Sequence, residues 1–299
     1  MAVDLAQARV ERTGRRRNGG AAAGRELGAH GHLTCMAWIA AVECRRGRAH
    51  RRRRMPCQDF GAFRKLGEGL LLGAVADGAG SSSQAHRGAR HAVRAAIKRL
   101  ARDLRTRDAD GGRNRNRPNE RELGALLRAA FADARADLDR LARQQGVPRG
   151  DFACTLIAFV ASPDWLGAAQ LGDGLLVSRA EGGGYQLLFR PDKGEYANET
   201  VFLTDRDGLD RVRVRSVQEP QSFVCVATDG LESVSIEQRA MQPHAPFFKP
   251  LDEYILAAED ERQARLDIRE FLASARLEAR SDDDRTLLLS GYRRGAPQS

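Results

Sequence analysis

Short apolar runs that stop at an aspartate are the feature that most constrains this chain. Residues 70–76 are long enough for a buried strand, and Asp77 and Gly78 follow them at once. Two more apolar runs end in the same way, before Asp173 and before Asp229. A carboxylate at such a strand end is held rigidly yet faces solvent, and glycine lets a backbone carbonyl approach its ligand. A hard cation with oxygen ligands suits this arrangement.

Two other Asp-Gly pairs in the chain can be compared with those that end apolar runs. Asp110 and Asp207 are followed by glycine too, but they lie in polar, charged stretches that predict plain turns. Another acidic cluster, residues 282–284, comes just before the apolar run 285–289. A single Asp-Gly pair is better explained as a turn than as part of a metal site. Several strand-end carboxylates in one chain favour a shared site.

The spacing of apolar residues predicts an α+β domain. Short turns between successive strands favour antiparallel pairing over parallel crossovers. No linker-like break or internal repeat divides residues 33–292. The expected helices are 84–104, 120–144 and 251–276, the first two as an antiparallel pair on a sheet, and the expected strands are 33–42, 70–76, 152–161, 165–171, 175–179, 185–189, 211–217, 222–227 and 285–292.

The composition indicates the cellular compartment in which this chain is expected. No apolar run approaches the ~18 residues that a membrane helix needs, and the N-terminus has no apolar segment typical of a secretory signal. The 5 cysteines form no CxxC pair, which favours free thiols in a reducing compartment over a zinc cluster. We therefore expect a cytoplasmic protein with no membrane partner.

The net charge of +9 lies almost entirely in the first 54 residues, which hold 13 Arg and 4 acidic residues. Residues 1–31 are rich in Arg, Gly and Ala and predict a flexible basic arm. Nucleic acid is one conceivable partner for such an arm. No aromatic side chain interleaves these arginines, so a solvated arm is favoured over nucleic-acid binding.

Six short motifs occur in an order that resembles a known family. They are Gln58-Asp59, Val75-Ala76-Asp77-Gly78, Asp151 with Thr155, Gly172-Asp173-Gly174, Ala227-Thr228-Asp229-Gly230 and Asp283-Asp284-Arg285-Thr286. This set resembles the type 2C, metal-dependent protein serine/threonine phosphatases, most of all their compact bacterial branch. The resemblance implies an α-β-β-α sandwich of two antiparallel sheets flanked by helices. It implies a catalytic domain over residues 32–293, followed by a tail over 294–299.

The resemblance also implies an activity and its cofactors. Members hydrolyse phosphoserine and phosphothreonine monoesters by attack of a water that bridges two divalent ions, Mn²⁺ or Mg²⁺, which prefer oxygen ligands. A third, weaker ion occurs in bacterial members. By this resemblance, Asp77 should bridge the two ions, and Asp229 and Asp283 should bind the first ion. The Gly78 carbonyl should bind the second ion, and Asp59 should contact the same ion directly or through water. Asp151 should join Asp229 in holding the third ion. Asp173 is expected to be structural.

A basic group should hold the substrate phosphate. The position five residues before Asp59, where the family carries its phosphate-binding arginine, is Arg54 here. Four arginines stand in a row, 51–54, so the register stays open, and His50 is a second candidate. Arg54 and Asp77 are thus the candidate catalytic residues.

Two departures from the family pattern bear on activity. Gln58 stands where many members carry Glu, and Ala79 stands where many eukaryotic members carry His. The second departure leaves protonation of the leaving group to water. The expected partners are phosphoprotein substrates and a cognate Ser/Thr kinase.

Two alternative functions have some support in the sequence. Gln58 favours a non-catalytic phosphoprotein-binding or regulatory module that keeps the phosphatase fold, whereas the core aspartates argue for an enzyme. A dinucleotide fingerprint at Gly78, Gly80 and Ser83 lacks its third glycine and is disfavoured.

Overall fold

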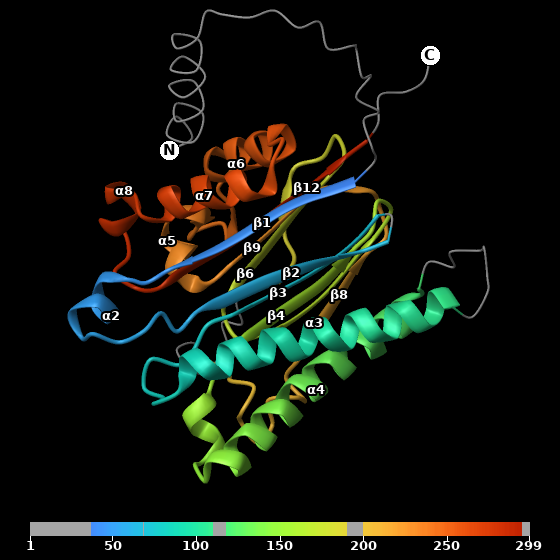
Figure 1. The fold of residues 1–299 in the computed structure, drawn as a ribbon. Helices are drawn as coiled ribbons and strands as arrows, with labels where there is room; N and C mark the ends of the chain where they lie inside the picture. The colour runs from blue at the N-terminus through green and yellow to red at the C-terminus, as the bar shows by residue number, and fades with distance from the viewer. Residues whose placement is uncertain (1–36, 68, 110–117, 190–199, 295–299) are drawn as a thin grey trace, which may run out of the picture.

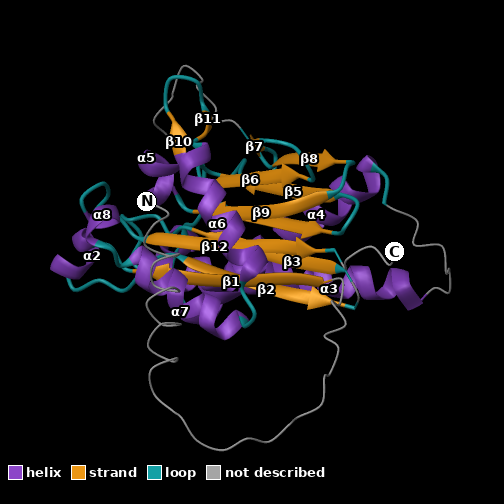
Figure 2. Cartoon of the chain, turned by 90° about the horizontal axis from the view of Figure 1, so that it is seen from above, coloured by secondary structure: helices purple, strands orange, loops and turns teal. Residues whose placement is uncertain are grey.

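Two five-stranded antiparallel sheets stack face to face with helices on both outer sides (Figure 1, Figure 2). The computed structural model describes residues 37–67, 69–109, 118–189 and 200–294. The predicted α-β-β-α sandwich is confirmed. The predicted arm over 1–31, the start of the strand predicted over 33–42, and Asp110 lie outside the described residues.

The strands follow the predicted order with few changes. The first sheet runs β1 (Ala37–Arg45), β12 (Arg285–Arg293), β9 (Gln221–Ala227), β6 (Leu175–Ala180) and β7 (Tyr185–Leu187). The second runs β2 (Phe60–Leu66), β3 (Leu70–Ala76), β4 (Leu156–Ala161), β5 (Leu166–Leu171) and β8 (Arg213–Val217). A small hairpin joins β10 (Ile236–Glu237) to β11 (Gln242–Pro243). The strand β2 was not predicted, because Gly61, Arg64 and Lys65 break its apolar pattern.

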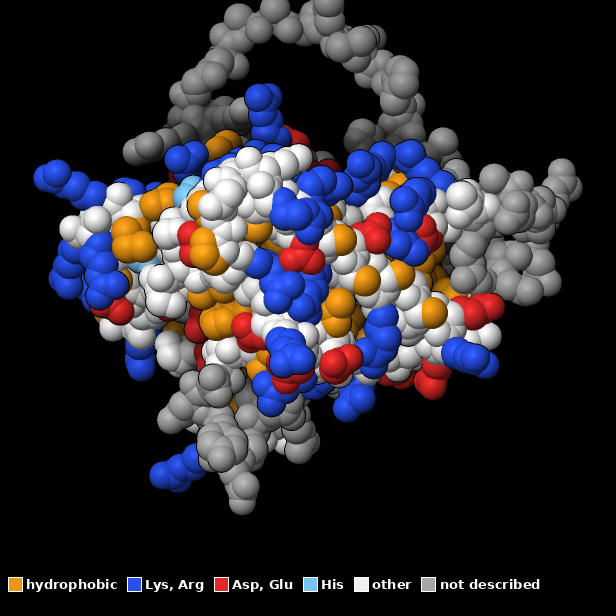
Figure 3. Space-filling view, turned by 90° about the horizontal axis from the view of Figure 1, so that it is seen from below, with side chains coloured by type: hydrophobic (Ala, Val, Ile, Leu, Met, Phe, Trp, Pro, Cys, Tyr) orange, Lys and Arg blue, Asp and Glu red, His pale blue; other side chains and the backbone are white. Residues whose placement is uncertain are grey.

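Two long helices cover the second sheet, as predicted. They are α3 (Ala85–Ala109) and α4 (Glu120–Gln145), which lie side by side below the sheet in Figure 1. Asn119 and Glu122 form a capping box at the start of α4, and Gly146 ends it in the left-handed conformation. The outer face of this pair carries basic and acidic side chains interspersed (Figure 3), including Arg99, which pairs with Asp103 at 2.6 Å and Asp133 at 2.9 Å.

The single helix predicted over 251–276 is wrong. That stretch holds most of α6 (Ala245–Ala257), all of α7 (Glu261–Leu272) and the start of α8 (Ala275–Glu278). The break comes at Asp260, whose backbone is extended and whose carboxylate accepts from the Arg262 N–H at 2.9 Å. This cap lets the chain turn, so that α6 and α7 both pack on the first sheet.

Four short helical segments complete the fold. Residues 45–54, for which no helix was predicted, contain α2 (Arg48–Arg52). The others are α5 (Glu232–Ser235) and the two 3-10 segments η1 (Arg149–Phe152) and η2 (Asp229–Leu231).

The hydrophobic core lies in three layers, one between the sheets and one under each pair of helices. The four cysteines in the described residues are free. Over the same residues, every helix is too short or too polar to cross a membrane.

Gly73 marks the tightest contact between strands in the layer between the sheets. It lies opposite Phe159 in the β3–β4 register, and a Cβ at Gly73 would clash with ring carbons of Phe159. Gly73→Ala should therefore destabilise the protein by ~1–3 kcal/mol in urea unfolding, as overpacked cores do. Replacing Phe159 by Leu in the same variant should recover part of that loss.

Gly124→Ala is the matched control for this substitution. Gly124 lies inside α4, where a Cβ would make only an ordinary contact with Val214 at 3.9 Å. That variant should be more stable than the parent by ~0.5–1 kcal/mol, since alanine favours helix. Equal effects of the two substitutions would contradict the packing described at Gly73.

Candidate active site

The turn after β3 fixes the position of Asp77. The Asp77 N–H donates to Thr155 Oγ1 at 3.0 Å, and the Thr155 N–H donates to the Asp77 carbonyl at 2.8 Å. Gly78 has no room for a side chain, because a Cβ there would lie 2.8 Å from Ala85 Cβ and 2.9 Å from the Gln58 carbonyl oxygen. The glycine is therefore required by close packing between the turn, α3 and the loop before β2.

Asp59, in the loop before β2, is buried close to Asp77. Thr228 Oγ1 donates to Asp59 Oδ2 at 2.7 Å and accepts from the Thr286 N–H at 2.9 Å. Asp59 Oδ1 is buried with no hydrogen-bond partner in the part of the chain that the structure describes. Burial raises the pKa of Asp59 to about 7. Burial and then the charge of Asp59 raise the pKa of Asp77 to about 10.

Asp229 and Asp283 reach the same region from the first sheet. Asp229 opens η2 directly after β9, and Asp283 precedes β12. Burial, followed by the charges of Asp77, Asp173 and Asp283, raises the pKa of Asp229 to about 8. Asp283 and Asp173 also raise the pKa of Asp77. The charges of Asp59, Asp77, Asp229, Asp283 and Asp173 thus act on one another in one region of the structure, and their role as metal ligands stays a prediction.

This acidic group fits a divalent cation in its chemistry. Its donors are carboxylate oxygens, the ligands that Mg²⁺ and Mn²⁺ prefer. Positive charge would offset both the cost of burying these carboxylates and their repulsion, and the unpartnered Asp59 Oδ1 is available as a ligand. Within the described residues, no three His, Cys, Asp or Glu side chains already form a group that could hold a metal ion. Binding would therefore require side-chain rotation, which is easiest for the exposed Asp283.

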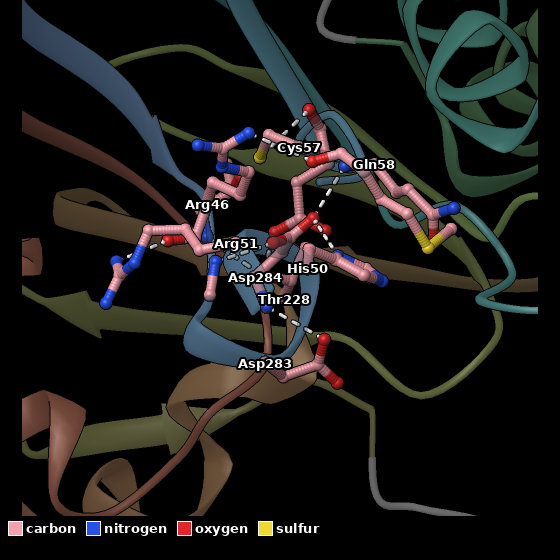
Figure 4. Close-up of polar contacts among 12 residues, drawn as sticks. Arg46, His50, Arg51, Cys57, Gln58, Thr228, Asp283 and Asp284 are labelled. Atoms are coloured by element: carbon pink, nitrogen blue, oxygen red, sulfur yellow. Dashed lines mark hydrogen bonds and ion pairs between the residues drawn. The ribbon is translucent and has the colours of Figure 1, made fainter. Parts of the chain in front are cut away.

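Asp284 is the residue that sequence reasoning missed (Figure 4). Its side chain is 1% exposed and accepts the Gly47 N–H at 2.7 Å and the Gln58 N–H at 2.6 Å. His50 Nδ1 lies 2.9 Å from Asp284 Oδ2. One carboxylate thus ties both ends of residues 47–58, here called the α2 segment, to the start of β12. The alternation of side chains along an extended chain could have revealed it, since Asp284 and Thr286 share a face that Asp283 and Arg285 do not.

The α2 segment also presents Arg54. The Met55 N–H donates to the His50 carbonyl at 2.9 Å and the Arg54 N–H to the Arg51 carbonyl at 3.2 Å, the pattern of a Schellman turn. Arg54 takes the left-handed position of that turn, with φ 58°, where glycine is usual. Its side chain is exposed and has no ion-pair partner among the described residues. His50, by contrast, is buried against Asp284.

Asp151 and Asp173 differ from each other in their hydrogen-bond partners. Asp151 Oδ2 accepts from Ser83 Oγ at 3.0 Å, and its carbonyl accepts from the Gln84 N–H, which ties it to the start of α3. Its role at a third ion stays a prediction. Asp173 accepts from Thr200 Oγ1 at 2.6 Å in the turn between β5 and β6.

Comparison with known proteins shows which family and fold this chain resembles. A family model described as Protein phosphatase 2C matches residues 46–273. The chain is 33% identical over 264 residues to Serine/threonine-protein phosphatase 3 of Escherichia coli (strain K12), which covers 85% of this chain and 98% of that protein. Two solved structures share the fold. Serine/threonine phosphatase Stp1 from Staphylococcus aureus has a TM-score of 0.55 at 14% identity, covering 91% of this chain and 100% of its own. Serine-threonine phosphatase 2C from Toxoplasma gondii has a TM-score of 0.57 at 13% identity, and the match covers 86% of this chain and 95% of that one.

The raised pKa values predict how stability depends on pH in the absence of divalent cations. Asp77 has a folded-state pKa of about 10 against an ordinary 3.8, so the folded protein holds a proton that the unfolded chain releases between these values. Stability in EDTA should therefore fall as the pH rises through that window. Asp77→Asn removes this loss, and at pH 8 in EDTA the variant should melt a few degrees above the parent.

Asp207→Asn is the matched control for that melting experiment. Asp207 is also followed by glycine, but it is exposed and its partner is Arg211 at 3.5 Å. Its melting temperature should stay within ~1 °C of the parent. An Asp77→Asn protein that melts below the parent under these conditions would contradict the repulsion described here.

Removal of the Asp284 carboxylate should loosen the α2 segment. Asp284→Ala leaves two buried N–H groups without acceptors, which should cost roughly 3 kcal/mol or more in urea unfolding. Asp282→Ala is the control, because Asp282 is exposed and contacts the Ala49 N–H only through its own carbonyl. Similar losses at the two positions would show that Asp284 does not hold the segment.

Proposed function

The chain belongs to the protein phosphatase 2C family and is a protein serine/threonine phosphatase, and from that premise we propose that it hydrolyses phosphoserine and phosphothreonine with two divalent ions, Mn²⁺ or Mg²⁺. The observation that supports this proposal best is the group formed by Asp59, Asp77 and Asp229. Burial is the main cause that raises the pKa of all three, and repulsion from neighbouring carboxylates adds to it. Divalent cations would relieve that repulsion.

Each carboxylate has a proposed position around the ions. Asp77 would contact both ions and the Gly78 carbonyl the second, with Asp229 and Asp283 on the first and Asp59 on the second side, directly or through water. Asp151 would help Asp229 to hold a third, weaker ion. When bound, the ions would supply an acidified water as nucleophile and positive charge for the phosphoryl oxygens.

Protein groups other than the carboxylates would orient the substrate. Arg54 is the favoured phosphate ligand, because it is exposed, unpaired among the described residues and held in a defined turn. His50 is less favoured, since Asp284 already occupies its Nδ1. With Ala79 in place of a histidine, the proton for the leaving oxygen would come from water.

Gln58 keeps the non-catalytic module as a second candidate. Its side chain is buried and its Oε1 has no partner within the described residues. An amide oxygen there can hold a water beside the ions but carries no charge. The module and the enzyme differ in a simple result, since only the enzyme turns over substrate.

The substrates would be phosphoproteins, with a cognate kinase that adds the phosphate. The catalytic unit would be residues 32–293, with residues 1–31 as an arm that carries no proposed ligand and 294–299 as a tail.

Turnover of a phosphothreonine peptide should require Mn²⁺ or Mg²⁺ and stop in EDTA. Asp229→Asn should lower kcat on the order of 10²-fold or more, because it removes one charge from the ligand set. Asp207→Asn, in a plain turn, should stay within a few-fold of the parent. Circular dichroism of each variant checks that it is folded.

Two outcomes of this assay would overturn the proposal. Full activity in EDTA would contradict the role of the ions. A folded parent with no turnover of any phosphopeptide in Mn²⁺ would favour the binding module instead.

A further inference from the structure

Arg285, the first residue of β12, is a buried cation without adequate partners. Its side chain is fully buried, yet its Nε, Nη1 and Nη2 atoms have no hydrogen-bond partner in the described residues. Glu278 Oε1 lies 3.9 Å from Nη2, too far for a hydrogen bond. Buried guanidinium groups are costly unless they are paired, so this one requires an explanation.

Two more arginines add positive charge at the same place. The β1–β12 register puts Arg45 directly opposite Arg285, so both side chains leave the same face of the sheet, and Arg45 Nε is also buried and unpartnered within the described residues. Arg51 of α2 donates to Glu278 Oε1 at 2.7 Å. Burial and then the charges of Arg51 and Arg45 lower the pKa of Arg285.

Glu278 is the one carboxylate that lies among these three guanidinium groups, and the charge of the neighbouring Asp284 acts more weakly on Arg285. Glu278 satisfies Arg51 but does not reach hydrogen-bond distance of Arg285, and the four side chains together carry a charge of about +2. A phosphate group, with a charge of about −1.5 to −2 and several acceptor oxygens, matches both the excess charge and the free donors. Arg51 and Glu278 are 31% and 25% exposed, so the cluster opens to solvent between α2 and α8.

We propose that Arg45, Arg51 and Arg285 form a second oxyanion site that binds inorganic phosphate, with the Glu278 carboxylate as its occupant when phosphate is absent. Rotation of Glu278 into solvent vacates the space beside Arg51, and the anion takes its place against Arg285 and Arg45.

This oxyanion site does not include Arg54, and it adjoins the turn that carries Asp229. A Cβ at Gly230, the residue after Asp229, would lie 3.0 Å from Arg285 Cγ. Arg285 also comes two residues after Asp283. A bound phosphate would fasten α2 and α8 to the ends of β1 and β12, beneath the turn that carries Asp229.

The test uses the full chain in EDTA, with Arg54→Ala present to remove the phosphate ligand proposed for catalysis. Calorimetric titration with sodium phosphate, against sodium chloride at equal ionic strength, should show saturable binding of one phosphate per chain and a matching rise in melting temperature. Sulfate should compete for the same site, since it has the same shape. Heat and melting changes equal to those in chloride would overturn the proposal.

The variants give changes of opposite sign. Glu278→Gln removes the competing carboxylate and should tighten phosphate binding roughly five-fold or more. Arg285→Met keeps the apolar stem and should abolish binding, and the partly exposed Arg51→Gln should weaken it if the Arg285 variant does not fold. Arg280→Gln, at an exposed residue two positions after Glu278, should change nothing. Weaker binding by Glu278→Gln would contradict the proposed competition.

Discussion

Repulsion among buried carboxylates is the constraint on which the rest of the structure depends. Asp59 and Asp77 come from the second sheet and Asp229 from the first. Burial is the main cause that raises the pKa of each, and neighbouring carboxylate charges add to it: that of Asp284 at Asp59, that of Asp59 at Asp77 and that of Asp77 at Asp229. The two sheets and their helices must supply enough packing to hold these groups together. Holding these carboxylates together costs folding free energy, and a bound cation would recover that free energy, which makes the group a strong ligand for cations.

Backbone contacts to neighbouring polar side chains hold the repelling groups in place. Thr155 fixes the turn at Asp77, Thr228 holds Asp59 and the start of β12, and Asp284 ties the α2 segment to the same strand. None of these three side chains is a proposed ligand. The precision of the site therefore depends on buried polar residues that hydrogen-bond to the ligand residues or to the backbone beside them.

The spacing of apolar residues predicted the α+β class, the resemblance to a known family implied the sandwich, and the candidate carboxylates were singled out because they leave a local signature. An apolar run ending at Asp77 or Asp229 is visible without any partner strand, and so is the helical period of α4. The break at Asp260 was missed because helical spacing continues across it, and only tertiary packing decides that the chain turns. Asp284 was missed because its neighbour Asp283 explained the acidic cluster, and its partners are more than 200 residues away. The buried Arg285 was missed because no local pattern distinguishes it from the many exposed arginines.

The most direct test of this account is the number of protons released when Mn²⁺ binds. Isothermal titration calorimetry of the EDTA-treated, dialysed protein at pH 7, in two buffers with different ionisation enthalpies, gives that number. If Asp77 and Asp229 hold protons with pKa values of about 10 and about 8, cation binding must displace them, and at least one proton should leave per chain. Mn²⁺ binding without proton release, or no binding at all, would contradict the claim that these carboxylates form the metal centre.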